Sequence, residues 1–226
     1  MSETLALLHT SHVLIPMFSE LCEQTIPDVA IFHMVDESLI KNTVAAQGLA
    51  KATVRRVLAL IQNAREAGAD AVLVTCSSIG PAVPLARQVF DFPVLRVDEA
   101  MAEEAVRLGA RIGVMATLAT TLEPTVALLR ETAAAQSRLI EVVPCLCDGA
   151  FDAVIAGDNE THDHIVTAAL VRLVGTVDVV VLAQASMAGV VGRIPPEARS
   201  KPVLSSPGSA ICRAREILLA ARLAGI

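Results

Sequence analysis

The hydrophobic positions of this chain fall into short continuous runs that alternate with longer segments rich in Ala, Leu, Arg and Glu. The short runs are nearly free of polar interruptions, which is typical of parallel strands covered on both faces. The longer segments are predicted to be helices, and strand–helix alternation indicates an α/β fold with parallel sheets. The predicted strands are Thr4–His9, Val29–Val35, Ala71–Thr75, Val94–Val97, Ile112–Met115, Ile140–Pro144, Val179–Ala183 and Val203–Ser205. The predicted helices include Gln47–Ala67, Glu99–Leu108, Glu123–Ala135, Thr161–Val174 and Ser209–Leu223.

The chain also contains an internal repeat. Three pairs of segments match in the same order and at one offset, within a residue: Asp70–Ile79 with Asp178–Met187, Leu7–Thr10 with Val114–Thr117, and Pro93–Leu95 with Pro202–Leu204. We therefore expect two pseudo-symmetric, doubly wound parallel-sheet lobes with the active site between them. The first lobe is predicted to span residues 1–98, with the C-terminal helix 207–226 packing back on it, and the second to span residues 99–206.

Composition supports a folded protein with a sizeable core. Of the 226 residues 54% are hydrophobic and 19% are charged, which excludes a disordered chain. The mean hydropathy of +0.58 raises the question of a membrane protein. Every apolar stretch is interrupted before the roughly 18 to 20 residues that a membrane-spanning helix needs, and the first residues lack the basic segment of a secretory signal. The sequence predicts a cytoplasmic protein with no membrane partner.

Charge and motifs exclude several further classes. The net charge is −6, no basic stripe is present, and the chain has no Tyr and no Trp to stack on bases, so nucleic acid is not an expected partner. Five cysteines in a chain without an export signal do not indicate a disulfide framework. No zinc, dinucleotide or Walker motif occurs, so no metal and no cofactor is expected.

Ligands of doubly wound sheets bind beyond the carboxyl ends of the strands, so the residues that follow each strand are the candidate site. The segment Cys76–Gly80 joins a buried strand to the next helix, and a helix N-terminus favours negative charge. Cys76 is therefore placed to act as nucleophile or general base, although a cysteine at this position is also a common core residue. The other strand-end groups are rich in hydroxyls: Thr10, Ser11, Ser77, Ser78, Thr117, Thr120, Thr121, Gln184 and Ser186.

Several residues near these positions have a structural reading beside the functional one. The threonines after Ala116 would serve equally well as caps of the following helix. His9 and His12 follow the first strand and are open to a substrate contact, whereas exposure or capping is the favoured reading of His162 and His164 at a helix start. Cys145 and Cys147 alternate along a strand and are favoured as core residues over a metal pair.

Taken together, the segments Val74–Gly80 and Leu182–Ala188 and the duplicated lobes resemble the aspartate/glutamate/hydantoin racemase superfamily, which also includes maleate isomerases and arylmalonate decarboxylase. The resemblance implies a cofactor-independent enzyme in which a cysteine from each lobe faces the substrate α-carbon. Cys76 matches the first cysteine of that pattern. Six residues fall where the family binds a substrate carboxylate: Thr10, Ser11, Ser77, Ser78, Thr117 and Ser186.

The chain departs from the family pattern at the second cysteine position, where it has Gln184. An amide forms hydrogen bonds with a substrate but does not carry a proton at neutral pH. The two-thiol racemase mechanism is therefore incomplete, and Gln184 is expected to have a binding role. In the family's decarboxylases a single cysteine protonates an enediolate, but that cysteine occupies the second-lobe position, whereas Cys76 occupies the first.

Three functions stay open from the sequence. The leading one is a racemase or isomerase in which Cys76 performs acid/base chemistry at the carbon next to the carboxylate of a small amino or dicarboxylic acid. The alternatives are a one-cysteine decarboxylase or isomerase of a small dicarboxylate, and a catalytically impaired protein that only binds carboxylates. Arg193 is a candidate for a further carboxylate contact. The number of subunits is also open, with a homo-oligomer among the alternatives.

Overall fold

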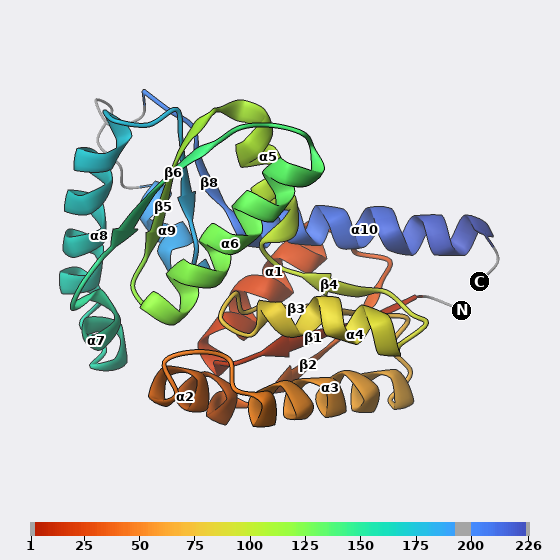
Figure 1. Cartoon of the computed structure of the whole chain (residues 1–226). Helices are drawn as coiled ribbons and strands as arrows, with labels where there is room; N and C mark the ends of the chain where they lie inside the picture. The colour runs from red at the N-terminus through yellow and green to blue at the C-terminus, as the bar shows by residue number, and fades with distance from the viewer. Residues whose placement is uncertain (1–2, 193–199, 225–226) are drawn as a thin grey trace. The chain divides into compact units, whose positions relative to one another are not determined.

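The computed structural model describes residues 3–192 and 200–224, and the chain divides into two compact units (Figure 1). The first unit comprises Met1–Asp98 and Pro207–Ile226, and the second comprises Glu99–Ser206. Arg193 lies outside the described residues. Each unit is described by itself below.

The first unit is built on a four-stranded parallel sheet with the strand order β2-β1-β3-β4. The strands are β1 (Thr4–His9), β2 (Ala30–Val35), β3 (Ala71–Val74) and β4 (Val94–Arg96). The helices are α1 (Ile15–Thr25), α2 (Glu37–Ala45), α3 (Lys51–Glu66), α4 (Val83–Val89) and the C-terminal α10 (Ser206–Ala224), of which α10 begins at the boundary between the units.

The second unit repeats this arrangement with the strand order β6-β5-β7-β8, again fully parallel. The strands are β5 (Arg111–Ala116), β6 (Glu141–Leu146), β7 (Val179–Leu182) and β8 (Val203–Ser205). The helices are α5 (Glu99–Leu108), α6 (Ala119–Ala135), α7 (Ala150–Ile155), α8 (Asn159–Val174) and α9 (Ala188–Val191). Two parallel α/β lobes with one strand order confirm the predicted fold class.

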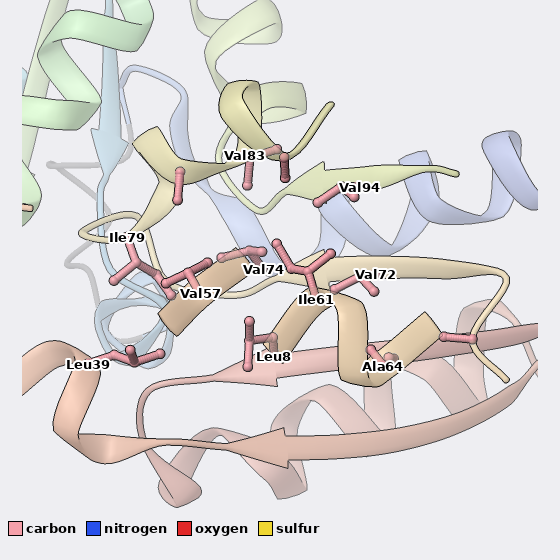
Figure 2. Packing of buried hydrophobic residues seen from close by; sticks show 14 residues of the cluster. Leu8, Leu39, Val57, Ile61, Ala64, Val72, Val74, Ile79, Val83 and Val94 are labelled. Carbon is pink, nitrogen blue, oxygen red and sulfur yellow. The ribbon is translucent and has the colours of Figure 1, made fainter. Parts of the chain in front are cut away.

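The sheet of the first unit is covered on both faces because its central strands are apolar at every position. In β1, Ala6 and Leu8 point to one face and Leu5 and Leu7 to the other, and all four are at most 1% exposed. Figure 2 shows the first of these faces, where Val57, Ile61 and Ala64 of α3 lie over Leu8, Val72 and Val74 of the sheet. The opposite face carries His9 and is covered by α1, whose Phe18 contacts the His9 ring.

The second unit has two corresponding cores. Ile112, Val114 and Ala116 of β5 pack with buried residues of α5 and α6, such as Leu129. On the opposite face Met115 and Leu182 pack with buried residues of α8, including Val166 and Leu170. The helices therefore cover both faces of each sheet, as the doubly wound pattern predicts, and the strands that lead to the strand-end residues are packed into a core on both sides.

The ends of the predicted elements differ from the structure where the backbone makes a special turn. The pattern predicts a helix from Gln47, but α3 begins only at Lys51. Gln47 and Gly48 both have positive φ angles, 53° and 159°, and so end the preceding segment instead of starting a helix. The predicted Glu99–Leu108 helix agrees with α5 at both ends. Among the described residues, no helix combines the length and apolar character needed to cross a membrane.

Candidate active site

Cys76 lies two residues beyond β3, in a tight turn at the carboxyl end of the first sheet. Its side chain is half-buried against the core that α3 covers. The Ile79 N–H donates to the Cys76 carbonyl at 3.2 Å, and the Gly80 N–H donates to the Ser77 carbonyl at 3.1 Å. The turn leads into a 3₁₀ turn, Gly80–Ala82, and only then into α4.

The prediction that Cys76 stands at a helix N-terminus was therefore wrong. Two of the N–H groups that a helix start would offer to an anion, those of Ile79 and Gly80, are used inside the turn itself. Pro81 and Pro84 are the second residues of the 3₁₀ turn and of α4, within the first turn, where a missing N–H is tolerated. The chemistry of this site rests on side chains more than on a helix dipole.

A buried ion pair supports this turn from the end of β4. Arg96 Nε lies 2.7 Å from Asp98 Oδ1 and Arg96 Nη2 lies 3.1 Å from Asp98 Oδ2, a bidentate pair with side chains 4% and 0% exposed. The guanidinium group packs on Gly80, because a Cβ atom there would lie 2.9 Å from Arg96 Cζ and closer still to Nε. Arg96 is a cation at a strand end that the sequence reading missed, but Asp98 balances its charge.

A chain of polar groups lies behind the turn, on the face of the sheet that α1 covers. His9 Nε2 lies 2.9 Å from His33 Nδ1, and the two rings are stacked. His9 Nδ1 lies 2.8 Å from the hydroxyl of Thr75, the residue before Cys76, and Ser19 of α1 bonds to His33 Nε2 at 3.0 Å. His9 is fully buried, so it cannot be the substrate contact that the sequence left open.

All hydrogen bonds of this polar network can form with both imidazole rings neutral. In one arrangement the Thr75 hydroxyl donates to the Leu8 carbonyl, 3.0 Å away, while His9 Nδ1–H donates to Thr75 and His33 Nδ1–H donates to His9 Nε2. Burial, together with the neighbouring His33, lowers the pKa of His9 from 6.5 to about 4, and burial also lowers the pKa of His33. At neutral pH the pair is therefore an uncharged structural network next to Cys76.

The remaining strand-end groups of the first unit vary in exposure. Thr10 is 4% exposed and Ser11 is half-buried, whereas His12 is exposed and contacts Glu37 at 2.6 Å. The His12 hydrogen bond lowers the pKa of Glu37, and His12 is thereby engaged on the surface. Ser77 and Ser78 are both buried and both have polar or electrostatic partners. Thr10, Ser11 and Cys76 remain as the polar groups available at this end of the sheet.

In the second unit Gln184 occupies the backbone position that Cys76 occupies in the first. Val74 precedes Cys76 by two residues and pairs with Leu8, and Leu182 precedes Gln184 by two residues and pairs with Met115. The following turn is also repeated, because the Met187 N–H donates to the Gln184 carbonyl at 3.1 Å. Cys76 and Gln184 therefore occupy equivalent positions of the repeat.

The Gln184 side chain is fixed by the end of β5. Its Oε1 atom accepts from the backbone N–H of Thr117 at 2.5 Å and from the Thr117 hydroxyl at 2.9 Å. The amide nitrogen makes no hydrogen bond among the described residues. With the oxygen engaged, Gln184 presents only N–H donors to a ligand.

The threonines of the second unit do not cap the following helix. The N-cap of α6 is Leu118, which has no side-chain cap hydrogen bond, and Thr120 and Thr121 lie inside the helix. The Thr120 hydroxyl oxygen is buried without a partner among the described residues, whereas Thr121 is 2% exposed and has one. Ser186 is exposed. Gln184, Thr120 and Ser186 are therefore the donors left at this end of the second sheet.

The structure also tests the predictions for the histidines and cysteines of the second unit. The prediction that His162 is exposed or caps the helix was wrong, because its side chain is buried at 3% exposure and Asp158 provides the cap of α8. His164 is exposed as expected. Cys147 is 2% exposed and packs in the core of α8, and Cys145 packs against the same core. The described residues include no group of three or more His, Cys, Asp or Glu side chains that would hold a metal ion.

Sequence reasoning missed Arg96, Asp98, His33 and Ser19. These residues lie on predicted elements or just after them, but their partners are distant in the chain, so no local motif links them. One signal was present for Arg96 and Asp98: charged residues flanking Val97 interrupt an otherwise apolar strand, which indicates a paired charge when the strand is buried.

The comparisons with known proteins agree with this architecture. A family model described as Asp/Glu/Hydantoin racemase matches residues 8–214. Among solved structures, allantoin racemase from Klebsiella pneumoniae is similar with a TM-score of 0.72 and 18% identity, covering 100% of this chain and 89% of that protein. A glutamate racemase from Bacillus anthracis gives 0.74 and 17%, covering 96% and 82%. A variant of arylmalonate decarboxylase gives 0.60 and 16%, covering 95% and 93%. Among curated protein sequences, none matches this chain.

Proposed function

Because this chain belongs to the Asp/Glu/Hydantoin racemase family, we propose that it is a cofactor-independent enzyme that moves a proton at the carbon next to a carboxylate. Its substrate is a small amino or dicarboxylic acid. Cys76 is the acid/base, and Gln184 is a binding residue. The catalytic step then uses one thiol, from the first unit.

The observation that carries this proposal is the contrast between the two equivalent positions of the repeat. Cys76 is half-buried and makes no hydrogen bond with another described side chain, so its thiol is available for proton transfer. Gln184 is bonded through its oxygen to Thr117 and offers only donors. A thiol can accept and return a proton, whereas an amide can only stabilise negative charge.

The other strand-end groups serve as donors to the substrate carboxylate and to the charge that develops on it. In the first unit these are Thr10 and Ser11, with Ser77 and Ser78 shaping the turn that holds Cys76. In the second unit they are Gln184, Thr120 and Ser186, while Thr117 holds the Gln184 oxygen and Thr121 has a partner of its own. Donors aimed at a developing oxyanion typically contribute about 10² to 10³ in rate each. No cation is required for this role, since hydroxyl and amide groups suffice.

The same contrast supports a second candidate, a decarboxylase or isomerase of a small dicarboxylate that uses one thiol. In that reaction loss of carbon dioxide leaves an enediolate, which Cys76 protonates from one face. Racemisation needs proton exchange on both faces, and only one of the two equivalent positions has a titrating side chain. A protein that merely binds carboxylates would not need the thiol.

The test is to incubate the protein with a panel of small chiral amino and dicarboxylic acids in deuterated water. Deuterium at the α-carbon of the recovered acid supports proton transfer, and release of carbon dioxide supports decarboxylation. Cys76→Ser should lower either activity about 10²- to 10⁴-fold while ligand binding persists, because a hydroxyl is a much weaker acid and base. Cys212→Ser, which changes an exposed cysteine of α10, is the matched control and should keep full activity.

Two results would contradict the proposal. Full turnover by the Cys76→Ser protein would remove Cys76 from the mechanism. Tight binding of an acid with neither deuterium uptake nor carbon dioxide release would indicate a binding protein.

A further inference from the structure

His162 of α8 is a buried histidine that the proposed mechanism does not use. It lies one turn before Val166 on the buried face of the helix, and its side chain is 3% exposed. Its Nδ1 atom lies 2.9 Å from Oδ1 of Asp163, but its buried Nε2 atom has no hydrogen-bond partner among the described residues. Because buried polar atoms in folded proteins are nearly always hydrogen-bonded, an atom without a partner points to a ligand or a water at that place.

The contact with Asp163 determines what the Nε2 atom offers. An ionised carboxylate only accepts hydrogen bonds, so the hydrogen of this bond belongs to Nδ1. In the neutral ring the other nitrogen, Nε2, then has a lone pair and no hydrogen. The Asp163 side chain is 23% exposed, so Nδ1 faces the surface of the unit and Nε2, on the opposite side of the ring, faces inward. His162 therefore presents a hydrogen-bond acceptor to the interior of the second unit.

The course of α8 places this acceptor at the carboxyl end of the second sheet. α8 leads from β6 back to β7, so it runs antiparallel to the strands. On its inner face, Leu173 Cδ2 lies 2.8 Å from the Cβ position of Gly113 in β5. His162 lies eleven residues before Leu173, which is about 16 Å along a helix. Thr117 lies four residues beyond Gly113, which is about 13 Å along a strand, so His162 and Thr117 are at a similar level.

The acceptor also lies on the same face of the sheet as Gln184. The core under α8 contains Met115 and Leu182. Thr117 and Gln184 come two residues after them, and side chains two apart in extended backbone share a face. Gln184 keeps extended backbone angles, φ −124° and ψ 138°, and its hydrogen bond to the Thr117 side chain agrees with this placement. His162 therefore adds an acceptor at the level and on the face where Gln184 offers N–H donors.

An acceptor beside donors suits a substrate with an N–H group next to its carboxylate. The proposed function assigns the Gln184 amide and the strand-end hydroxyls to the carboxylate. The lone pair of His162 Nε2 accepts a hydrogen bond from an ammonium, amide or ureido N–H and repels a carboxylate oxygen placed against it. The arrangement therefore distinguishes acids with a nitrogen on the α-carbon from acids without one.

We propose that His162 is a specificity-determining residue, whose Nε2 atom accepts a hydrogen bond from the nitrogen on the α-carbon of the substrate. This inference rests on the proposed function, because it needs a carboxylate bound to Gln184. It favours amino acids and their N-acyl or ureido derivatives over dicarboxylic acids that lack nitrogen.

The test measures binding by calorimetry to the Cys76→Ser protein, which holds an acid without converting it. The probes are amino acids paired with their nitrogen-free analogues: alanine with propionate, aspartate with succinate, and glutamate with glutarate, each amino acid as both enantiomers. In the pair that binds most tightly, the amino acid should bind at least about tenfold more tightly than its analogue, since a hydrogen bond to a charged group is worth about 10- to 100-fold in affinity.

Three variants assign this preference to His162. His162→Phe keeps a ring but removes the acceptor, so it should weaken binding of the amino acid about 10- to 100-fold and leave binding of the analogue unchanged. His162→Gln places an amide oxygen near the position of Nε2 and should restore much of the preference. His164→Phe changes an exposed histidine of the same helix and should have no effect.

Nitrogen NMR of the unsubstituted ring gives a readout that does not depend on any His162 variant folding. In the free protein at neutral pH the Nε2 signal should be that of a nitrogen without hydrogen, and it should shift when the amino acid is added but not when the analogue is added. A protonated Nε2, or equal losses for both members of a pair in His162→Phe, would overturn the inference. Deuterium uptake or carbon dioxide release without a preference for α-nitrogen would overturn this inference alone, whereas binding of none of these acids would overturn the proposed function with it.

Discussion

The ends of the two sheets have the same backbone turn but different side chains on and behind it. Strands β3 and β7 each end in a turn that is closed by the same backbone hydrogen bond. The acceptor is the carbonyl of Cys76 after β3 and the carbonyl of Gln184 after β7. Behind Cys76 lie polar supports, the His9–Thr75 network and the Arg96–Asp98 pair. The corresponding positions of the second unit are Ala116, Ala183 and Ser205 for His9, Thr75 and Arg96.

This difference supports the proposal that the two equivalent positions of the repeat have separate roles. In the first unit the buried polar groups bond to one another, and the Cys76 thiol makes no hydrogen bond with any other side chain that the structure describes. In the second unit small residues occupy the corresponding positions, and the Gln184 side chain itself is bonded to Thr117. A side chain fixed in this way is suited to binding, because its donors are held in place before a ligand arrives.

The largest expected effect comes from making the two positions alike. Gln184→Cys places a second thiol at the equivalent of Cys76. Since a positioned acid/base group is worth about 10² to 10⁴ in rate, this variant should gain proton exchange on the second face of the substrate. The measurement is α-deuterium incorporation into both enantiomers of a bound acid, compared with one enantiomer for the natural protein.

Gln184→Ser is the matched control for that variant. It removes the same amide and introduces a serine, which is similar in size to cysteine but does not titrate near neutrality. It should bind the acid more weakly and gain no exchange on the second face. Exchange on both faces by the natural protein would show that another proton carrier exists and that the contrast between the units is incomplete.

A smaller effect is expected from Gly80→Ala, which makes the Cys76 turn resemble the second unit, where the equivalent residue is Ala188. The new Cβ would lie 2.9 Å from the buried Arg96 Cζ, so the Arg96–Asp98 pair must shift. Overpacking of this kind costs about 1 to 3 kcal/mol, and the displaced turn should also lower the turnover that depends on Cys76. Urea unfolding and the deuterium assay measure the two effects.

Gly189→Ala is the control in the second unit. Apart from its chain neighbours and the backbone of its own helix, no described atom lies within 4 Å of the Cβ position at Gly189, and its φ angle is not positive. Alanine is the better helix former by about 1 kcal/mol, so this variant should be as stable as the natural protein or slightly more stable. Equal losses from both substitutions would show that the Arg96 contact does not constrain Gly80.

The most gradual effect is a loss of folding stability in acid, spread over several pH units, that originates in the first unit. The folded protein lowers the pKa of His9 to about 4, against 6.5 for an ordinary histidine. The fold therefore favours the neutral ring, and the contribution is fully present above pH 6.5 and is lost as the pH falls from 6.5 to about 4. The slope is at most about 1.4 kcal/mol per pH unit for one histidine.

Urea unfolding between pH 4 and pH 7 measures this slope. The groups that face His9 are His33 from β2, Thr75 from β3 and Phe18 from α1, and none of them carries a negative charge that would stabilise a protonated ring. His9→Gln should flatten the slope, whereas a His164→Gln variant, altered at an exposed position of α8, should retain it. A flat profile for the natural protein would show that His9 is not held neutral.

The strands and the long helices were predictable because burial leaves a direct mark on sequence. Runs such as Ala71–Val74 and Val179–Leu182 are apolar at every position, since both faces of a parallel strand are covered. Cys76 and Gln184 could be singled out because they follow those runs at matched positions of the repeat. The 3₁₀ turn at Gly80–Ala82 was not predicted, because the competition between turn hydrogen bonds and a helix start depends on local geometry as well as on the prolines.

The sequence by itself determined the α/β class, the duplication of the strands and the placement of one thiol and one amide at equivalent strand ends. All of these follow from local composition and from spacing along the chain. Only the tertiary structure decided that His9 is a buried partner of His33, that Arg96 is neutralised by Asp98 under Gly80, and that Thr117 holds Gln184. The reason is that hydrogen bonds and ion pairs are set by distance in space, and chain folding brings together groups such as Thr117 and Gln184 that no local pattern connects.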